Sequence, residues 1–291
     1  MKLLRHKIYL LNLFLLLLSC KQKENYQGKI FDAHLHFEEA IKNKEQKIKE
    51  FEDYNIVSGA ISGPWNASEK YRSGTKIKLL FGLMFPCPDG IMPYGQGKCF
   101  EDGKEFPDIR WVRQQILDKK IDFLGELLNE YYGISPSDSI MFPYYALAEE
   151  FNLPVGIHTG LAGDNNGCPN YNPSMGDPQL MEKLLIKYPK LKVWIMHAGM
   201  PYLKGTLAIL ANYPRVYIDI SVIDNPDIVS KTDFHSYMKS LIDSGFENRL
   251  MFGSDGGDYT KMINAVNELD FLTKEQKEKI FYKNAEQFFS H

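Results

Sequence analysis

The chain has 291 residues, of which 44% are hydrophobic and 24% are charged, and its formal net charge is −3. This composition is typical of a globular protein with a sizeable core and excludes a disordered or strongly basic chain. No run of lysine and arginine interleaved with aromatic residues occurs, so nucleic acid is not expected as a partner.

The N-terminus has the pattern of an export signal. Positive charges at Lys2, Arg5 and Lys7 precede an apolar run over residues 8–18. This run is too short to span a bilayer, which needs about 20 apolar residues. The segment is therefore predicted to direct export rather than to form part of the fold.

The end of this signal resembles that of a bacterial lipoprotein, because the apolar run closes in Leu17-Leu18-Ser19-Cys20. The resemblance implies that residues 1–19 are removed and that Cys20 becomes the lipidated first residue. The protein is then expected to be exported and anchored to a membrane by its lipid, facing the periplasm or the cell surface. Residues 20–28 are predicted to be a polar tether. An ordinary secretory signal, or a short anchor that stays, is the alternative.

Three cysteines follow the predicted signal, namely Cys87, Cys99 and Cys168. Export would place them in an oxidising compartment, where a disulfide can persist. Cys87 and Cys99 bracket a loop rich in glycine and proline and are the predicted pair. One thiol then remains free.

The first predicted strand, Ile30–Phe37, carries two histidines on one face. Side chains alternate along a strand, so Asp32, His34 and His36 project to the same side. Two imidazoles two residues apart offer two nitrogen atoms to one divalent cation. Taken alone, the pattern is also consistent with polar residues on a solvated face.

A unit of strand, loop and helix recurs from residue 30 to the end of the chain. The predicted strands are Ile30–Phe37, Ile56–Ser62, Ile77–Phe85, Ile121–Leu127, Pro154–Thr159, Lys192–His197, Val216–Ser221 and Leu250–Asp255. Helical patterns lie between them, among them Glu38–Tyr54, Pro143–Phe151, Pro178–Lys187 and Phe234–Ser244. A capping box, Thr273 with Gln276, is predicted to open the last helix, which runs to about Phe289.

This alternation predicts a single α/β domain over residues 29–291. Strands that alternate with helices pair in parallel, and eight such units fit one closed (β/α)8 barrel, or TIM barrel. An open doubly wound sheet is the alternative, but no glycine-rich phosphate loop follows any of the predicted strands. Two long connections, Pro86–Asp108 and Leu161–Asp177, are predicted to lie at the C-terminal end of the barrel and to serve as a lid.

Polar side chains cluster at the ends of the predicted strands. The residues at these ends are His34, His36, Glu126, His158, His197 and Asp255. They include four of the seven histidines in the chain. Because the active sites of TIM barrels lie at the C-terminal ends of the strands, we expect these six side chains to converge.

The segments around these residues resemble the amidohydrolase superfamily, in particular the amidohydrolase-related metal-dependent hydrolases. They are Asp32-Ala33-His34-Leu35-His36-Phe37, Leu124-Gly125-Glu126-Leu127, Gly156-Ile157-His158-Thr159-Gly160, Ile195-Met196-His197-Ala198-Gly199, Phe252-Gly253-Ser254-Asp255 and Asn284-Ala285-Glu286-Gln287-Phe288. The segments follow the order of the family over nearly the whole chain that remains after the signal.

The resemblance implies that His34, His36, His158 and Asp255 bind a divalent metal ion. His197 would bind a second metal or hydrogen-bond the reacting group. Zinc, as one or two ions, is the expected metal, because it prefers imidazole and carboxylate ligands. Asp255 is expected to accept a proton and pass it to the leaving group, and His197 to stabilise an oxyanion.

The fourth strand departs from the best-known family pattern. Many two-metal relatives carry a carboxylated lysine there, whereas this chain has Glu126. A glutamate can bridge two metals, or contact the water of a single metal, or contact the substrate. Glu126 is therefore expected to act in catalysis or to be a further ligand.

Other polar residues have less specific predictions. Asp32 and Asp219 are expected to be structural hydrogen-bond partners. Arg110 and Arg113 are expected at a solvated helix start, although either could bind a substrate carboxylate. Tyr131 is expected to serve in packing.

The leading prediction is a metal-dependent hydrolase that acts on an amide, lactone or ester bond of a small molecule. A metal-dependent, non-oxidative decarboxylase of an aromatic acid would need the same metal. A lipid-anchored binding protein without catalytic activity is the alternative outside enzymes.

Overall fold

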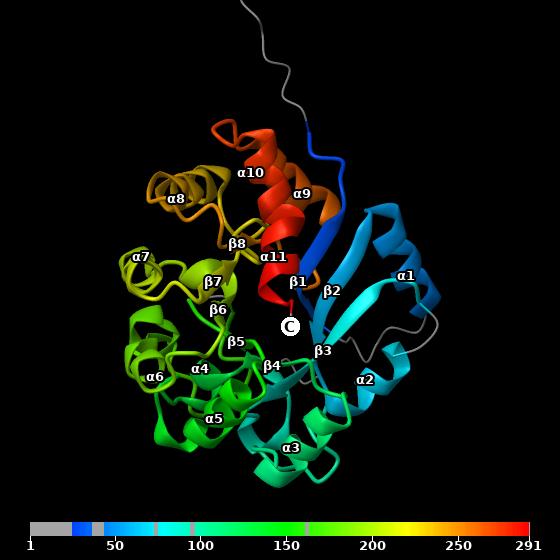
Figure 1. Cartoon of the computed structure of the whole chain (residues 1–291), viewed down its shortest axis with the longest axis vertical. Helices are drawn as coiled ribbons and strands as arrows, with labels where there is room; N and C mark the ends of the chain where they lie inside the picture. The colour runs from blue at the N-terminus through cyan, green and yellow to red at the C-terminus, as the bar shows by residue number, and fades with distance from the viewer. Residues whose placement is uncertain (1–24, 37–43, 73–74, 94–96, 161–162, 291) are drawn as a thin grey trace, which may run out of the picture.

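The computed structural model describes residues 25–36, 44–72, 75–93, 97–160 and 163–290 (Figure 1). The predicted signal and Cys20 lie outside these residues. Within the predicted tether, Tyr26 stacks on Phe281 with 5.0 Å between the ring centroids. Among the helices that the structure describes, none has the length and apolar character needed to cross a membrane.

Eight parallel strands form one sheet in the order β1 to β8 and curl into a barrel that is ringed by helices (Figure 1). The strands are β1 Ile30–His36, β2 Ile56–Ser62, β3 Lys78–Phe85, β4 Phe123–Leu127, β5 Val155–Ile157, β6 Val193–Ile195, β7 Val216–Asp219 and β8 Leu250–Met251. Each strand pairs with the next one along the chain, as the alternating pattern predicted.

The first strand closes the barrel through the segment that follows β8. The amide of Ala33 donates to the carbonyl of Phe252, and the amide of Asp255 donates to the carbonyl of His34, both at 2.9 Å. Gly253 permits this approach, because a Cβ atom there would lie 2.8 Å from Cβ of His34. The prediction of a single TIM barrel is confirmed.

Helices cover the outside of the barrel. They are α1 Lys44–Asp53, α2 Trp65–Tyr71, α3 Ile109–Leu117, α4 Asn129–Tyr132, α5 Phe142–Glu150, α6 Glu182–Lys187, α7 Leu203–Asn212, α8 Lys231–Asp243, α9 Tyr259–Glu268, α10 Lys274–Glu278 and α11 Asn284–Phe288. The predicted capping box of Thr273 and Gln276 opens α10, and a π turn over Lys279–Lys283 joins α10 to α11.

Several predicted strands are longer than the observed ones. Strands β5, β6 and β8 end before His158, His197 and Asp255, so these three side chains follow the strands rather than lie on them. The backbone explains two of the cases, because φ is 58° at His197 and 46° at Asp255. A residue in this left-handed region cannot continue a strand.

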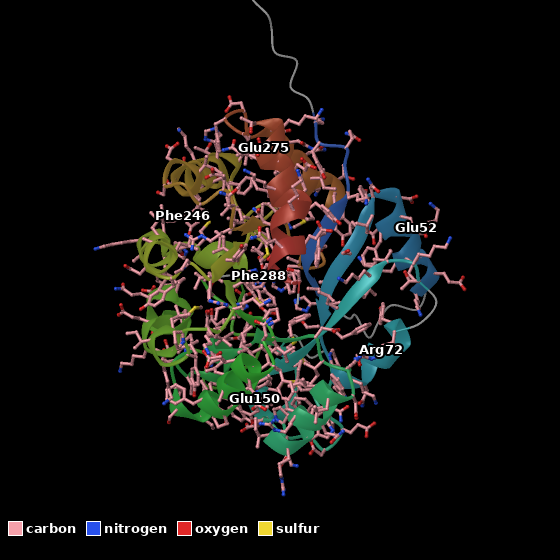
Figure 2. The ribbon with its side chains drawn as sticks, viewed as in Figure 1. Glu52, Arg72, Glu150, Phe246, Glu275 and Phe288 are labelled. Atoms are coloured by element: carbon pink, nitrogen blue, oxygen red, sulfur yellow. A yellow bond between two sulfur atoms is a disulfide. The ribbon has the colours of Figure 1, made fainter. Side chains whose placement is uncertain are left out.

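Helix α11 closes the N-terminal end of the barrel. In Figure 1 it lies across the middle of the ring of strands, and Figure 2 shows Phe288 at this position. Phe288 and Phe289 are buried and lie 5.6 and 5.2 Å from Trp194, between ring centroids. Phe289 also stacks on Phe31 of β1 at 5.2 Å. The polar cluster therefore has only the opposite, C-terminal mouth of the barrel available to it.

A disulfide joins Cys87 to Cys99, and Cys168 is a buried free thiol, as predicted. The disulfide fixes a loop that follows β3. The amide of Met92 donates to the carbonyl of Gly97 at 2.9 Å inside this loop. These contacts place Met92 at the C-terminal mouth, where it lines the cavity described below.

Candidate metal centre and active site

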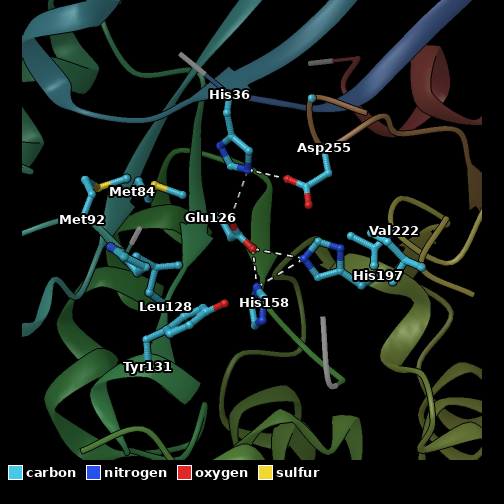
Figure 3. A pocket seen from close by; sticks show the side chains of 13 residues that line it. His36, Met84, Met92, Glu126, Leu128, Tyr131, His158, His197, Val222 and Asp255 are labelled. Atoms are coloured by element: carbon cyan, nitrogen blue, oxygen red, sulfur yellow. Dashed lines mark hydrogen bonds and ion pairs between the residues drawn. The ribbon is translucent and has the colours of Figure 1, made fainter. Parts of the chain in front are cut away.

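The six predicted polar residues converge at the C-terminal mouth of the barrel. A cavity of about 310 Å³ opens there, and five of the six line it: His36, Glu126, His158, His197 and Asp255 (Figure 3). His34 lies beneath the cavity and is 1% exposed. The prediction that these side chains meet at one end of the barrel is confirmed.

A first group of donor atoms comes from β1 and from the segment after β8. Nε2 of His34 lies 3.2 Å from Nε2 of His36, and Nε2 of His36 lies 2.8 Å from Oδ1 of Asp255. Nε2 of His34 and Oδ1 of Asp255 are 3.6 Å apart. Two ligands that hold one zinc ion in tetrahedral geometry lie about 3.3 Å from each other. This spacing suits donor atoms that share one cation.

A second group lies across the cavity. Nδ1 of His158 is 2.5 Å from Oε1 of Glu126, and Nε2 of His197 is 3.2 Å from both of these atoms. The sequence predicted that His158 would join His34, His36 and Asp255. The structure instead places His158 with Glu126 and His197.

Glu126 joins the two groups. Its Oε2 atom faces the first group, 3.7 Å from Nε2 of His34 and 3.4 Å from Nε2 of His36. Its Oε1 atom faces His158 and His197. His34 belongs to two sets of residues whose donor atoms all lie within 4.8 Å of one another. One set contains His36 and Asp255, and the other contains Glu126 and His197. A single carboxylate thus divides its oxygens between two sets of imidazoles.

Asp219 and Ser221 orient His34 and His197 from behind. Nδ1 of His34 lies 3.2 Å from Oδ2 of Asp219 and 3.0 Å from Oγ of Ser221. The same hydroxyl lies 3.0 Å from Nδ1 of His197. When Nδ1 of His34 donates to the carboxylate, Nε2 is left with a lone pair that points to the cavity. Carboxylate partners of this kind are typical behind metal-binding histidines.

The two aspartates that were predicted to be structural differ in position. Asp32 accepts from the amides of His34 and Ser254 at 3.1 and 3.0 Å and from the Tyr259 hydroxyl at 2.8 Å. It therefore holds β1 to the segment after β8, as expected. Asp219 instead contacts an imidazole of the site directly.

The charges of the site favour ionised carboxylates. Burial lowers the pKa of His34, but Asp219 and Asp255 outweigh burial and hold this pKa well above its usual range. Burial raises the pKa of Glu126, yet His158 and the neighbouring imidazoles hold it well below its usual range. Burial also raises the pKa of Asp255, but His34 and other imidazoles outweigh burial and lower this pKa to about 2.

The donor set fits a divalent transition metal. Imidazole nitrogens and carboxylate oxygens are the ligands that zinc and similar ions prefer. In each group the nitrogens lie about as far apart as the ligands of one ion, and acidic side chains are available to balance its charge. Among the described residues that line the cavity, no lysine or arginine competes with a cation.

Left-handed backbone gathers around this mouth. The non-glycine residues with positive φ include His197, Ala198, Val222 and Asp255, where φ is 58°, 53°, 66° and 46°. Such conformations cost about 1–3 kcal/mol each and are frequent at functional sites. Here they turn the chain sharply after β6, β7 and β8, and so aim the side chains into the cavity.

The sequence pattern did not predict the apolar part of the cavity. The rest of its lining includes Met84, Met92, Leu128, Tyr131 and Val222, which are labelled in Figure 3, and also Ile228. Tyr131 was predicted to serve in packing rather than in substrate stacking; it lines the cavity and packs against His158 at 5.0 Å between ring centroids. Most of these residues come from loops, where no periodic pattern marks an inward position. The hydrophobic character of Tyr131 and its place just after β4 were the available signal.

The two arginines that were considered as substrate ligands lie elsewhere. Arg113 forms a bidentate pair with Glu150 at 2.5 and 2.6 Å. The Arg110 side chain is 90% exposed and lies 3.6 Å from Asp108, the residue that caps α3. The prediction of a solvated helix start is confirmed.

A family model described as amidohydrolase matches residues 119–290. The chain therefore belongs to the amidohydrolase family. One curated relative, protein fluG of Emericella nidulans, is 28% identical over 105 residues. That match covers 36% of this chain and only 11% of fluG.

Solved structures share the fold over most of the chain. An uncharacterised TIM-barrel protein of Bordetella bronchiseptica matches with a TM-score of 0.64 and 17% identity, over 89% of this chain and 98% of its own. A probable 2-pyrone-4,6-dicarboxylic acid hydrolase of Acinetobacter baumannii matches with a TM-score of 0.60 and 15% identity, over 90% and 99%. The manganese-bound 5-carboxyvanillate decarboxylase of Novosphingobium aromaticivorans matches with a TM-score of 0.58 and 13% identity, over 92% and 98%. At these identities the likeness concerns the fold.

Proposed function

We propose that this protein is a metal-dependent hydrolase that cleaves an amide, lactone or ester bond of a small molecule. The observation that carries the proposal is the position of Glu126 between two groups of imidazoles at one cavity. The family of the chain supports it, because its members are metal-dependent enzymes that include hydrolases and decarboxylases.

In this proposal His34, His36 and Asp255 hold one divalent ion, and His158 and His197 hold a second or orient the substrate. Glu126 bridges the two positions. Zinc is the proposed ion, since it suits imidazole and carboxylate ligands. When bound, such an ion polarises a carbonyl group and activates water near neutral pH.

The side chains of the site divide the remaining work. Asp255 has a low pKa and is therefore ionised at neutral pH, as a proton acceptor must be. Its side chain is 25% exposed at the mouth, so it can take a proton from the attacking water and deliver it to the leaving group. His197 keeps Nδ1 on Ser221 and directs Nε2 into the cavity, where a proton carried on Nε2 would be donated to a developing oxyanion.

Metal analysis of purified protein and of four variants tests the proposal. His158→Ala and Asp255→Ala are expected to lose most bound metal or most activity while circular dichroism shows an intact barrel. His197→Ala should impair turnover more than binding of the first ion. His235→Ala is the matched control, because His235 lies on α8 and pairs with Asp270 on the surface. Full hydrolytic activity in thoroughly chelated protein would contradict the proposal.

Glu126→Gln separates the two roles of the glutamate. If Glu126 bridges two ions, the metal content falls toward one ion per chain. If it serves the substrate alone, the metal content holds and turnover falls. Unchanged metal content together with unchanged turnover would exclude both roles.

Decarboxylation of an aromatic acid is the alternative reaction, and the shared fold of 5-carboxyvanillate decarboxylase supports its inclusion. The same metal-loaded protein can be offered esters, lactones, amides and aromatic acids. Release of carbon dioxide without hydrolysis would replace the proposed reaction. Ligand binding without either reaction would favour a binding protein.

We also propose that the protein is exported and held at a membrane by a lipid on Cys20. The support is the sequence from Lys2 to Cys20, which resembles a lipoprotein signal. A Cys20→Ala variant is expected to stay unprocessed or to leave the membrane fraction. An unchanged mature N-terminus with unchanged membrane association would contradict this proposal.

A further inference from the structure

We propose that the substrate of this site is uncharged beyond its reacting group and has a small apolar body. The inference rests on the proposed hydrolase function and names the class of molecule that the same cavity accepts. It follows from the lining of the cavity, from the charges around it and from the way in which one wall is fixed.

The cavity has two chemically different parts (Figure 3). The donor atoms of His36, Glu126 and Asp255 mark where a reacting carbonyl group would lie. The rest is a wall formed mainly by Met84, Met92, Leu128, Tyr131, Val222 and Ile228, which we call the apolar wall. The whole cavity has a volume of about 310 Å³, which is at the lower end of the range of about 300–1,000 Å³ that is usual for ligand pockets. A compact molecule with one hydrolysable bond fits both parts.

The six side chains of the apolar wall carry no positive charge that could pair with a carboxylate. No lysine or arginine is found among the described residues that line the cavity, and Arg113, which the sequence offered as a ligand for a substrate carboxylate, pairs with Glu150 instead. A carboxylate held against the apolar wall would lose its hydration without gaining a counterion, and among the six side chains of this wall the Tyr131 hydroxyl is the sole hydrogen-bond donor. Burial of an unpaired charge of this kind is strongly unfavourable.

Buried acids near the cavity add to this effect. Glu130 lies with Oε2 3.8 Å from Nε2 of His158. Asp224 is 1% exposed and follows Val222 of the apolar wall by two residues. These acids place no positive charge beside the apolar wall and so give a substrate carboxylate no counterion. A dicarboxylate such as that named for the Acinetobacter relative is therefore a poor candidate.

One residue of the apolar wall, Met92, packs against the disulfide. Sδ of Met92 lies 3.0 Å from Sγ of Cys99 and 3.9 Å from Sγ of Cys87, so the disulfide packs directly behind it. Met92 is 3% exposed. A side chain that is packed in this way does not need to be ordered on binding, so this part of the wall can select by shape and polarity.

A pair of esters that differ only in charge tests the inference. 4-Acetoxybenzamide and 4-acetoxybenzoate have nearly the same shape, and only the second carries a carboxylate away from the reacting ester. Zinc-loaded protein is expected to hydrolyse the amide-bearing ester with at least a tenfold higher kcat/KM, after correction for spontaneous hydrolysis. If a lactone or an amide is the better bond, the same neutral and carboxylated pair is made for that bond.

Ile228 offers a way to reverse the preference. Its side chain lies at the mouth and is 61% exposed, so a lysine there reaches the cavity without being buried. Ile228→Lys should raise kcat/KM for the anionic ester about tenfold relative to Ile228→Gln, the uncharged control. Circular dichroism verifies that both variants fold.

The outcomes separate the two proposals. Equal or better hydrolysis of the anionic ester by the unmodified protein overturns the inference and leaves the hydrolase function standing. No difference between the lysine and glutamine variants also overturns it, because the apolar wall would then not face the substrate. Failure to hydrolyse any compound of the panel overturns the hydrolase function, and the substrate class falls with it.

Discussion

Nδ1 of His34 and Oδ2 of Asp219 lie 3.2 Å apart although 185 residues separate them in the sequence. Asp219 is completely buried and also accepts from Nε1 of Trp194 and from the amide of His197. The carboxylate therefore cannot turn away from the imidazole. It fixes both the tautomer and the direction in which Nε2 of His34 points.

Asp219→Asn should weaken metal binding about 10–100-fold, since removal of such a partner disturbs a ligand without removing it. Competition with a chromogenic chelator measures the zinc dissociation constant. Asp227→Asn, on the surface and paired with Lys261, is the matched control and should bind zinc as the unmodified protein does. Equal zinc affinity of the Asp219 and Asp227 variants would show that Asp219 does not act on His34.

When the pH is lowered, the metal should be released at a higher pH than it would be from histidines with their usual pKa. Burial lowers the pKa of His36 and His158, but the carboxylates of Asp255 and Glu126 prevail and raise each pKa above its usual value. Protons therefore compete more strongly with the metal, and the apparent zinc affinity must fall as the pH falls. Dialysis against a chelator at a series of pH values from 8 to 5.5 measures the zinc that remains. Constant zinc retention over this range would contradict the prediction.

The disulfide should contribute to stability as well as to the shape of the cavity. Cys87 and Cys99 are 12 residues apart, and a crosslink over a loop of this size stabilises a protein by roughly 3 kcal/mol in the chain-entropy model. The double variant Cys87→Ser, Cys99→Ser should lose about this much free energy of unfolding in urea. Cys168→Ser is the control, because that thiol is unpaired. Equal stability of the double variant and the control would contradict the prediction.

The closure of the N-terminal end by α11 predicts that stability and chemistry can be separated. Phe288→Ala removes a buried ring from the far end of the barrel and should cost about 3–5 kcal/mol of the free energy of unfolding. The zinc content per folded chain should not change. Phe246→Ala, at a half-buried position, is the control and should cost less. Loss of zinc from folded Phe288→Ala protein would show that the two ends are coupled.

The fold could be predicted because its signals are local and repeated. Eight apolar strands that alternate with helices admit few arrangements other than a closed parallel barrel. The residues of the site could be predicted for the same reason, since the C-terminal ends of parallel strands meet at one mouth. His34 and His36 needed only the two-residue period of β1.

The grouping of the site residues could not be predicted from strand ends alone. His197 and Asp255 follow β6 and β8 in left-handed conformations, which decide the direction of each side chain. His158 presents Nδ1 rather than Nε2 to Glu126, a choice that depends on its tertiary surroundings. The apolar wall comes mainly from loops, where Met92 carries no periodic signal.

Asp224 provides a prediction about stability and pH. Its carboxyl group is 1% exposed and neither oxygen has a hydrogen-bond partner in the structure. Burial, with a contribution from Asp32, raises the pKa of Asp224 well above its usual value. The folded protein therefore keeps this proton at pH values where the unfolded chain has released it. Ionisation of Asp224 therefore lowers the free energy of unfolding.

The sign of the effect follows from the protons bound by each state. Between the pKa of about 4 in the unfolded chain and the raised pKa in the folded protein, the unfolded state binds fewer protons, so stability falls as the pH rises. Asp224→Asn carries no charge and escapes this loss. Its advantage in the free energy of unfolding should therefore be small near pH 4.5 and grow toward pH 8. Urea unfolding at three pH values, with chelator throughout, measures the difference, and Asp243→Asn on the surface of α8 should show no such growth. Parallel pH profiles for Asp224→Asn and the unmodified protein would mean that the Asp224 carboxyl group is not held uncharged by the fold.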